Sequence, residues 1–161
     1  MTVRDLPSER ISKKALSVWR IKAALEICVL LVLVVVLFIF TLRFAWPLYL
    51  PWIGVILLLL FSFWHVVIFP QWKWRKWRYA VYEKEIELLR GIFIEKHTVI
   101  PMNRVQHVDT EQGPIYKKFG LRAVTISTAA GVHEIPALTE ETAQSLRDKI
   151  ATLVGMDEED E

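Results

Sequence analysis

The hydrophobic residues of this chain concentrate in two long runs in its first half. The runs extend from Ile21 to Leu42 and from Leu48 to Phe69, and each has 22 residues. As an α-helix, a run of this length spans about 33 Å, close to the hydrocarbon thickness of a bilayer. Backbone groups in lipid must be paired within their own segment, so helices are expected. The pattern predicts two transmembrane helices, 21–42 and 48–69, joined by an external turn, 43–47.

Three other interpretations of the apolar runs are disfavoured by their length and flanking residues. A cleaved signal peptide has a shorter apolar core followed by a small-residue cleavage site, and the first run has neither property. A re-entrant loop or a buried soluble hairpin is disfavoured because both runs are long enough to cross the whole bilayer. We therefore expect an integral membrane protein.

Lysine and arginine residues flank the two apolar runs unevenly. Only Arg43 lies between the runs, whereas two groups of cations lie outside them. Because cytoplasmic flanks carry the excess of Lys and Arg, we expect a multi-pass protein of the plasma membrane. Both termini, including the N-terminal segment 1–20, should face the cytoplasm. The outer cations are Arg4, Arg10, Lys13, Lys14, Arg20 and Lys22 before the runs, and Lys73, Arg75, Lys76 and Arg78 after them.

Two polar residues inside the predicted helices are candidates for a role beyond topology. Glu26 lies one turn into the first helix, where Lys22 is its i,i+4 neighbour, and an interfacial ion pair is the favoured interpretation. His65 lies about one turn from the cytoplasmic end of the second helix, where a neutral imidazole is favoured over a proton relay. The helix centres are otherwise nearly apolar, which weighs against a transporter or transporter subunit.

The juxtamembrane segment 70–78 alternates cations with tryptophans, and residues 71–78 read QWKWRKWR. Positive flanks serve topology and anchoring in general, and this is the favoured role. Recognition of anionic lipid is the alternative, since each cation near such a leaflet contributes about 1 kcal/mol. Nucleic acid is the least favoured partner, because the formal net charge is only +2. The candidate headgroup contacts are Trp72, Lys73, Trp74, Arg75, Lys76, Trp77 and Arg78.

From Tyr79 onward the chain changes to short Val-, Ile- and Thr-rich runs separated by turn residues, a pattern typical of strands. A short helical turn is expected from Pro114 to Phe119, with Gly120 as its left-handed stop. The cytoplasmic domain should cover 79–154. The expected strands are 79–82, 85–90, 92–101, 105–111, 121–128 and 132–136.

An amphipathic helix is expected to close the domain. Thr139 is a suitable N-cap, and an apolar stripe follows at helical spacing. Gly155 should end the helix, and the acidic tail 155–161 should be disordered. The expected fold is therefore a membrane helical hairpin plus an α+β domain. The domain would be a curved antiparallel sheet or partial barrel of about six to seven strands, capped by the C-terminal helix. The stripe consists of Ala143, Leu146, Ile150 and Leu153.

The sequence carries no recognisable catalytic or metal-binding motif. His97, His107 and His133 are not at metal-ligand spacing, and the single cysteine, Cys28, lies in the first apolar run. Asp109 alternates with Glu111 on one expected strand, as solvent-facing charges commonly do. No cofactor, metal site or catalytic residue is therefore predicted, and we expect that the protein is not an enzyme.

Three segments of the second half resemble a known family. Residues 100–121 read IPMNRVQHVDTEQGPIYKKFGL, followed by VTISTAAG at 124–131 and HEIPAL at 133–138. Their order and spacing resemble the YdbS-like bacterial pleckstrin-homology (PH-like) domain family over about residues 74–154, with the pair of helices upstream. The matching motif residues with expected structural roles are Arg104, Gln106, Asp109, Gly113, Pro114, Gly120 and Pro136.

This resemblance implies a barrel-like domain capped by one helix and no catalysis. It also implies assembly with a second copy or with a larger membrane protein that carries related PH-like domains. From the residues, Arg104 and Asp109 are candidates for an ion pair. We expect a non-enzymatic, membrane-anchored interaction or assembly module. An anionic-lipid or membrane-surface sensor, with membrane lipids as partners, is the alternative.

Overall fold

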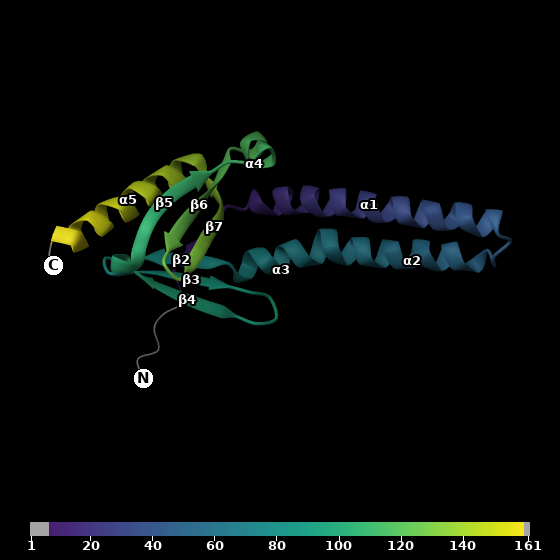
Figure 1. Cartoon of the computed structure of the whole chain (residues 1–161), viewed down its shortest axis with the longest axis horizontal. Coiled ribbons are helices and arrows are strands. Elements are labelled where there is room, and N and C mark those ends of the chain that lie inside the picture. Colours follow the sequence, from purple (N-terminus) through teal and green to yellow (C-terminus); the bar gives the residue numbers. More distant parts are fainter. Residues whose placement is uncertain (1–6, 160–161) are drawn as a thin grey trace. The chain divides into compact units, whose positions relative to one another are not determined.

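The computed structural model describes residues 7–159, and the chain divides into two compact units (Figure 1). The first unit, called the domain below, consists of the described residues of 1–15 and 73–161. The second unit, residues 16–72, is called the membrane hairpin. Residues 7–15 of the expected cytoplasmic N-terminal segment therefore belong to the folded domain.

The membrane hairpin is formed by two long apolar helices. Helix α1 covers Ala15–Arg43, and a second continuous helix consists of α2 (Tyr49–Phe63), the π-helix η1 (Trp64–Ile68) and α3 (Phe69–Lys76). Both are long and apolar enough to cross a membrane, with 29 and 28 residues. Almost none of their apolar residues are buried inside the protein, which suits helices that face lipid. Two candidate transmembrane helices, as predicted, are thus confirmed.

The second helix continues beyond Phe69, where the sequence suggested its end. Pro70 cannot donate a backbone hydrogen bond, and its ring would clash with the carbonyl four residues earlier in a regular α-helix. The π-turn just before it widens the helix, and the amide of Phe69 bonds five residues back to the carbonyl of Trp64. This wider turn relieves the clash, so the helix runs on to Lys76.

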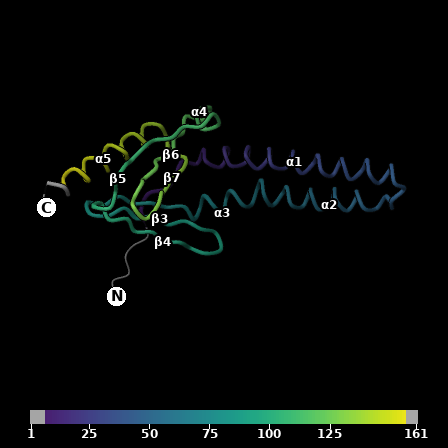
Figure 2. Tube along the Cα trace, in the orientation of Figure 1, coloured from purple at the N-terminus to yellow at the C-terminus, as the bar shows by residue number. Residues whose placement is uncertain are grey.

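The domain contains two antiparallel sheets, traced in Figure 2. One sheet has the strand order β1-β2-β3-β4 and the other the order β5-β6-β7, so the strands do not close into a barrel. The expected antiparallel sheet with a C-terminal helix is confirmed. The strands are β1 (Glu9–Arg10), β2 (Arg78–Val81), β3 (Glu85–Arg90), β4 (Lys96–Pro101), β5 (Val105–Glu111), β6 (Leu121–Thr128) and β7 (Gly131–Thr139).

Strand β1 was not foreseen, because two residues carry no readable alternation. Glu9 pairs with Tyr79 of β2 across the ladder. Burial and a hydrogen bond to the Glu9 carboxylate raise the pKa of the Tyr79 hydroxyl above its usual value. Further along, the amide of Ser12 donates to the carbonyl of Ala137 (3.1 Å), and Lys14 Nζ donates to the carbonyl of Phe119 (3.4 Å).

Two strand boundaries differ by three or four residues from the expected ones, and the others agree to within one residue. The expected strand 92–101 begins only at Lys96, and the residues before it form a hairpin loop. The expected last strand 132–136 extends to Thr139, passing through Pro136. The β6–β7 register shifts between Arg122 and Val124, and Ala137 has a φ of 54°. This irregularity lets β7 continue past a proline that would otherwise interrupt the ladder.

The two helices of the domain begin where the sequence predicted. Helix α4 (Pro114–Phe119) starts after Gly113 and ends at Gly120, whose φ of 62° is left-handed. Helix α5 (Glu140–Glu159) starts after Thr139, whose hydroxyl accepts from the amide of Thr142 (3.3 Å).

The expected end of α5 at Gly155 is wrong, because the helix passes through this residue to Glu159. The expected disordered tail is therefore helical as far as Glu159, since glycine inside a helix costs only about 1 kcal/mol. Residues 160–161 of the tail lie outside the described residues.

The domain core lies between the sheets and α5. Ala143 and Ile150 are fully buried and Leu146 nearly so, which confirms these positions of the predicted stripe, while Leu153 is half-buried. Alternate residues of the strands supply the opposite side of the core. The largest fully buried apolar side chains are Tyr79, Ile86, Leu88, Met102, Leu121, Ile126, Ile135, Leu138 and Ile150.

Candidate functional site

The tryptophans of the juxtamembrane segment have three different environments. Trp77 is only 5% exposed and belongs to the domain core, so its expected headgroup contact is replaced by a structural role. Trp74 is half-buried, and its indole Nε1 donates to the carbonyl of Ile11 (3.1 Å), with the Arg10 guanidinium over its ring. Trp72 is 42% exposed and belongs to the membrane hairpin, where its ring meets Trp64 edge-on.

The cations of the same segment are also unequal. Arg75 and Lys76 are exposed, whereas Lys73 is half-buried and Arg78 lies in β2 opposite Leu89 of β3. Lys76 forms an ion pair with Glu95 of the β3–β4 loop and holds the pKa of that carboxyl below its usual value. One end of the loop is thereby linked to the end of α3.

The β3–β4 hairpin loop, residues 91–95, carries the most exposed large apolar side chains of the described residues. Phe93 is 81% exposed and Ile94 84%. Gly91 has a φ of 122°, and a Cβ atom there would lie 1.9 Å from the carbonyl oxygen of Ile94. Glycine is therefore the residue that fits this position, and the loop makes a tight turn with Phe93 and Ile94 exposed at its tip.

Two cations form the base of this loop. Arg90, the last residue of β3, pairs directly with Lys96, the first residue of β4. Like charges in this position repel each other, which is unfavourable unless an anion lies nearby. Their combined field extends to His133 of β7: partial burial first, and then Arg90 and Lys96, hold the pKa of its imidazole below the usual 6.5.

We expect the variant Arg90→Gln/Lys96→Gln to raise the pKa of His133 but not to restore it fully, because burial remains. The depressed pKa of His133 also determines how the stability of the unmodified domain changes with pH. Below pH 6.5 the unfolded chain binds the proton more readily, so acidification lowers stability, whereas above this pH there is no such loss. NMR titration of the histidine ring in the full-length protein measures the shift. An unchanged pKa would contradict the role of the two cations.

Strand β4 has an open edge. In the described residues it pairs with β3 alone. The amide of Met102 donates to the carbonyl of Lys84 (2.9 Å), which fixes the alternation of the ladder. Because bonded and non-bonded pairs alternate in an antiparallel ladder, Thr98 bonds to β3, and His97 and Val99 direct their amides away from it. Val99 is 42% exposed, so this short edge is accessible.

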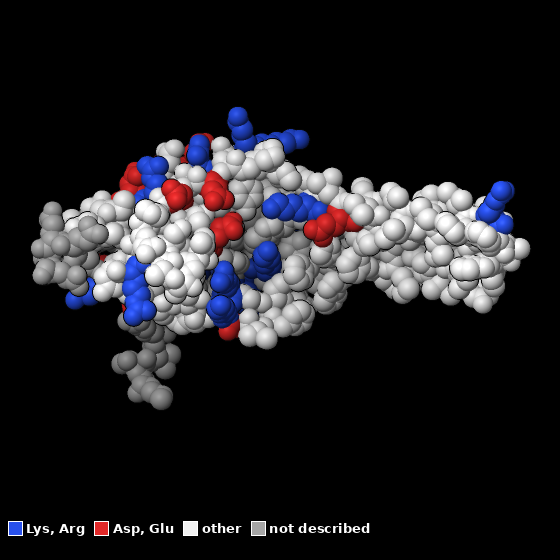
Figure 3. Space-filling model, viewed as in Figure 1, with Lys and Arg blue, Asp and Glu red and all other residues white. Residues whose placement is uncertain are grey.

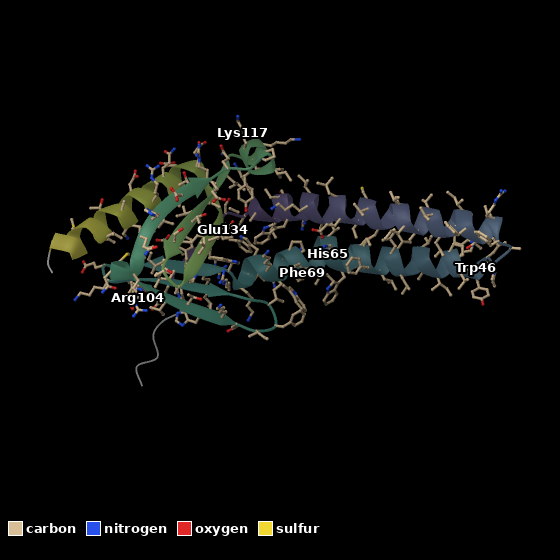
Figure 4. The ribbon with its side chains drawn as sticks, viewed as in Figure 1. Trp46, His65, Phe69, Arg104, Lys117 and Glu134 are labelled. Carbon is tan, nitrogen blue, oxygen red and sulfur yellow. The ribbon has the colours of Figure 1, made fainter. Side chains whose placement is uncertain are left out.

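The expected motif residues lie on the second sheet and around α4. Arg104 ends a 3-10 helix, η2 (Met102–Arg104), and is exposed (Figure 4). Gln106 and Asp109 of β5 are also exposed. Among the ion pairs that the described residues form, none joins Arg104 to Asp109, so the proposed pair is not formed. Gln112, two residues before α4, has a defined contact: its Nε2 donates to the carbonyl of Leu121 (3.0 Å).

The two intramembrane polar residues come together. His65 Nε2 lies 2.8 Å from Glu26 Oε2, where the two helices face each other (Figure 4). His65 is part of the π-helix η1, and its ring also stacks on Phe61. Such π-turns are frequent at functional positions in helices. Each residue was interpreted from its own local sequence, because the two are 39 positions apart in the chain.

Metal-ligating side chains do not gather in the described residues. No group of three or more His, Cys, Asp or Glu residues there is arranged to hold a metal ion. His97 lies 3.5 Å from the buried carboxylate of Glu87, and His107 is exposed on β5. Charged side chains do gather on the domain, whereas the visible face of the membrane hairpin carries few (Figure 3).

Sequence reasoning missed the hairpin tip and the open edge. The signal for the tip was present: three large apolar residues follow Gly91 and are bounded by charges at Arg90 and Glu95. They were interpreted as the start of a strand, although a strand with one wet face would alternate. The edge carries no comparable signal, because strand order depends on the whole sheet.

Comparison with known proteins agrees with this architecture. The family model described as "Bacterial PH domain" matches residues 20–154. UPF0699 transmembrane protein YdbS of Bacillus subtilis (strain 168) is 41% identical over 158 residues, 98% of this chain and 99% of the relative. No solved structure matches the chain with statistical significance.

A second relative matches over a shorter region. UPF0699 transmembrane protein YdbT of the same organism is 28% identical over 82 residues, which are 48% of this chain but only 17% of that longer protein. The first relative, 99% of which is covered by the match, is named a transmembrane protein, and two helices of this chain are long and apolar enough to cross a membrane. The chain is therefore a membrane protein with a PH-like domain, and it belongs to the bacterial PH domain family, in its YdbS-like group.

Proposed function

We propose that this protein is a non-enzymatic assembly module anchored at the cytoplasmic face of the plasma membrane. Its PH-like domain would bind a second PH-like domain through the open edge of β4. That domain belongs either to another copy of this chain or to a larger membrane protein of the same family. The single observation that carries the proposal is the pair of outward-directed amides at His97 and Val99.

The orientation proposed here has both termini in the cytoplasm, with the helices as two membrane spans. It is supported by the cations outside the apolar runs and by the isolated Arg43 at the turn between them. Residues 7–15 and 73–159 belong to one compact domain, which supports placing both portions on the same side of the membrane. That placement requires an even number of spans.

An open strand edge favours a partner that is itself extended. Added strands bind through main-chain hydrogen bonds, and side-chain pockets supply specificity. Native proteins protect edges that have no partner with charges and prolines. In β4 these residues stand only at the two ends, Lys96 and Pro101, and Val99 between them is exposed.

The choice of partner is supported by the family. The longer relative, YdbT, shares an 82-residue region with this chain, which shows that related segments occur within larger transmembrane proteins. Related domains present similar strands, and closed pairs of like surfaces are the commonest form of protein assembly. A strand from a second PH-like domain is therefore the proposed occupant of the edge.

We expect Val99→Pro to abolish this assembly while leaving the domain folded. Proline at 99 removes an outward amide and no β3–β4 hydrogen bond, and loss of the strand contact should weaken association about tenfold or more. The measurement is co-capture of two differently tagged full-length copies from solubilised membranes. Mass spectrometry of the captured chains detects the partner if it is a larger relative and not a second copy.

Val99→Ala is the matched control, since it shortens the same side chain but keeps the amide. It should retain most of the co-capture if main-chain contacts dominate. Equal co-capture by Val99→Pro and the unmodified chain would refute the edge, and capture of no protein with a PH-like domain would refute the assembly function. Hydrogen exchange of the domain verifies that both variants fold.

A membrane-surface sensor is the second candidate function. The specific observation in its favour is the apolar, cation-flanked tip of the β3–β4 hairpin. The sensor function would use the loop tip, whereas the assembly function would use the outward amides of β4. The two functions can therefore coexist in one protein.

A further inference from the structure

We propose that the tip of the β3–β4 hairpin inserts into the surface of an anionic membrane. In this arrangement Phe93 and Ile94 enter the boundary between headgroups and acyl chains, and Arg90 and Lys96 contact lipid phosphates. The contact goes beyond the protein assembly proposed above, and it involves none of the outward amides of β4.

The first support is the exposure of the tip. Phe93 and Ile94 are 81% and 84% exposed, while no large apolar side chain of the two membrane helices exceeds 66%. The tip is therefore more accessible than side chains whose surroundings are lipid. Burying a side chain of this size favours a membrane-bound state by about tenfold or more. Apolar groups presented in this way mark a contact surface.

The second support is the fixed shape of the loop. The positive φ of Gly91 sets the start of the loop, and the ion pair between Glu95 and Lys76 holds its end. A loop that is already ordered loses little conformational entropy when it binds. The ion pair also occupies the single carboxylate of the loop, so it does not oppose an anionic partner by itself.

The third support is charge. Arg90 and Lys96 face each other across the ladder, directly behind the apolar tip. An apolar group ahead of paired cations matches the layers of a membrane surface, where acyl chains lie beneath phosphates. Each cation near an anionic leaflet contributes about 1 kcal/mol, so the pair changes the docking equilibrium by about thirtyfold. A protein partner would need an apolar pocket with an anionic rim.

The fourth support is covalent proximity. Helix α3 ends at Lys76 and β2 begins at Arg78, so a single residue separates the second membrane helix from the first sheet strand after it. A membrane surface is thus always close to the domain, and docking is an intramolecular step at high effective concentration. A modest affinity of each tip residue for the membrane is then sufficient to keep most copies of the domain docked.

The test uses the full-length chain in nanodiscs, which leave both faces of the bilayer accessible. Cys28 is replaced by serine, and Ile94→Cys carries an environment-sensitive fluorophore. Nanodiscs of phosphatidylcholine alone are compared with nanodiscs that also contain phosphatidylglycerol. We expect quenching by a nitroxide on lipid acyl chains, and protection from aqueous iodide, with phosphatidylglycerol present and much less of both in phosphatidylcholine alone.

Val132→Cys is the matched control, an apolar residue that is 67% exposed at the start of β7. A probe there should be quenched by iodide in both membranes. With the probe at position 94, Arg90→Gln/Lys96→Gln and, separately, Phe93→Ser should each lower the ratio of docked to free domain by about tenfold or more. Because Val99 is unchanged in all these proteins, co-capture through the β4 edge is measured independently.

Two results overturn the proposal. One is a probe at position 94 that is as accessible to iodide as the probe at position 132 in phosphatidylglycerol nanodiscs. The other is a probe at position 94 that is protected from iodide but not quenched by the lipid nitroxide, which places the tip against protein. Hydrogen exchange of the β3–β4 hairpin in the same samples shows that each variant is folded, so a loss of quenching reports docking alone.

Discussion

Replacing Trp77 by alanine is expected to destabilise the domain by about 3–5 kcal/mol, the usual cost of removing a large buried aromatic side chain. Its side chain is only 5% exposed and belongs to the core of the domain. Since single domains are stable by about 5–15 kcal/mol, this loss removes a large part of the total. The measurement is hydrogen exchange by mass spectrometry on the full-length protein in nanodiscs, with faster exchange expected in the peptides of β2 and β3.

Trp72→Ala is the matched control, because it removes the same side chain five positions earlier in the same segment. Trp72 is 42% exposed and belongs to the membrane hairpin, where it contacts Trp64. We expect domain exchange to stay unchanged in this variant. If both variants accelerated exchange equally, the different roles assigned to these tryptophans would be wrong.

Replacing Gly91 by alanine should disrupt the β3–β4 hairpin. An L-residue at a φ of 122° is strained by about 1–3 kcal/mol, and the new Cβ would lie 1.9 Å from the carbonyl oxygen of Ile94. The loop must therefore rearrange, and we expect its tip to lose its fixed shape. Thermal unfolding of the full-length protein measures the loss, and hydrogen exchange locates it at β3 and β4.

Gly155→Ala provides a control of opposite sign. Gly155 lies inside α5, and a Cβ atom there meets nothing within 4 Å. Alanine should raise the stability of this helix by up to about 1 kcal/mol, because glycine is the poorer helix former. A Gly91→Ala variant with normal exchange at β3 and β4 would show that the loop tolerates another conformation.

Most elements of the fold could be predicted from local patterns. The apolar runs indicated both long helices, and Gly113, Pro114 and Gly120 marked the limits of α4. Thr139 was predicted to be an N-cap from its residue type, and in the structure its hydroxyl accepts from an amide three residues later. These signals act over one or two turns of chain, so they need no knowledge of the tertiary structure.

The errors have both local and tertiary causes. Pro70 and Gly155 usually interrupt helices, yet a π-turn before one and the low cost of the other allow both helices to continue. The two residues of β1 pair with a strand about 70 positions away, a contact without local periodicity. The loop tip was assigned to a strand because Ile92, Phe93 and Ile94 are individually good strand formers.

The candidate site was only partly predictable for a geometric reason. In the segment 71–78 the alternation of tryptophans suggested one common surface. A helix turns about 100° per residue, so Trp72 and Trp74 lie about 200° apart around α3. The chain then changes from helix to strand after Lys76, which directs Trp77 into the core. Which face each ring occupies depends on where that change occurs.

The domain is interrupted in sequence by the whole membrane hairpin. Ser12 bonds to Ala137 and Ile11 to Trp74, so its N-terminal portion is synthesised first but finds its partners last. Contacts between distant positions form slowly, because a long loop must close before they add stability. Completion of the domain therefore waits until both apolar helices have been made. A chain in which only one of the two helices crossed a membrane would hold the two portions of the domain on opposite faces and would leave its N-terminal strand without a partner.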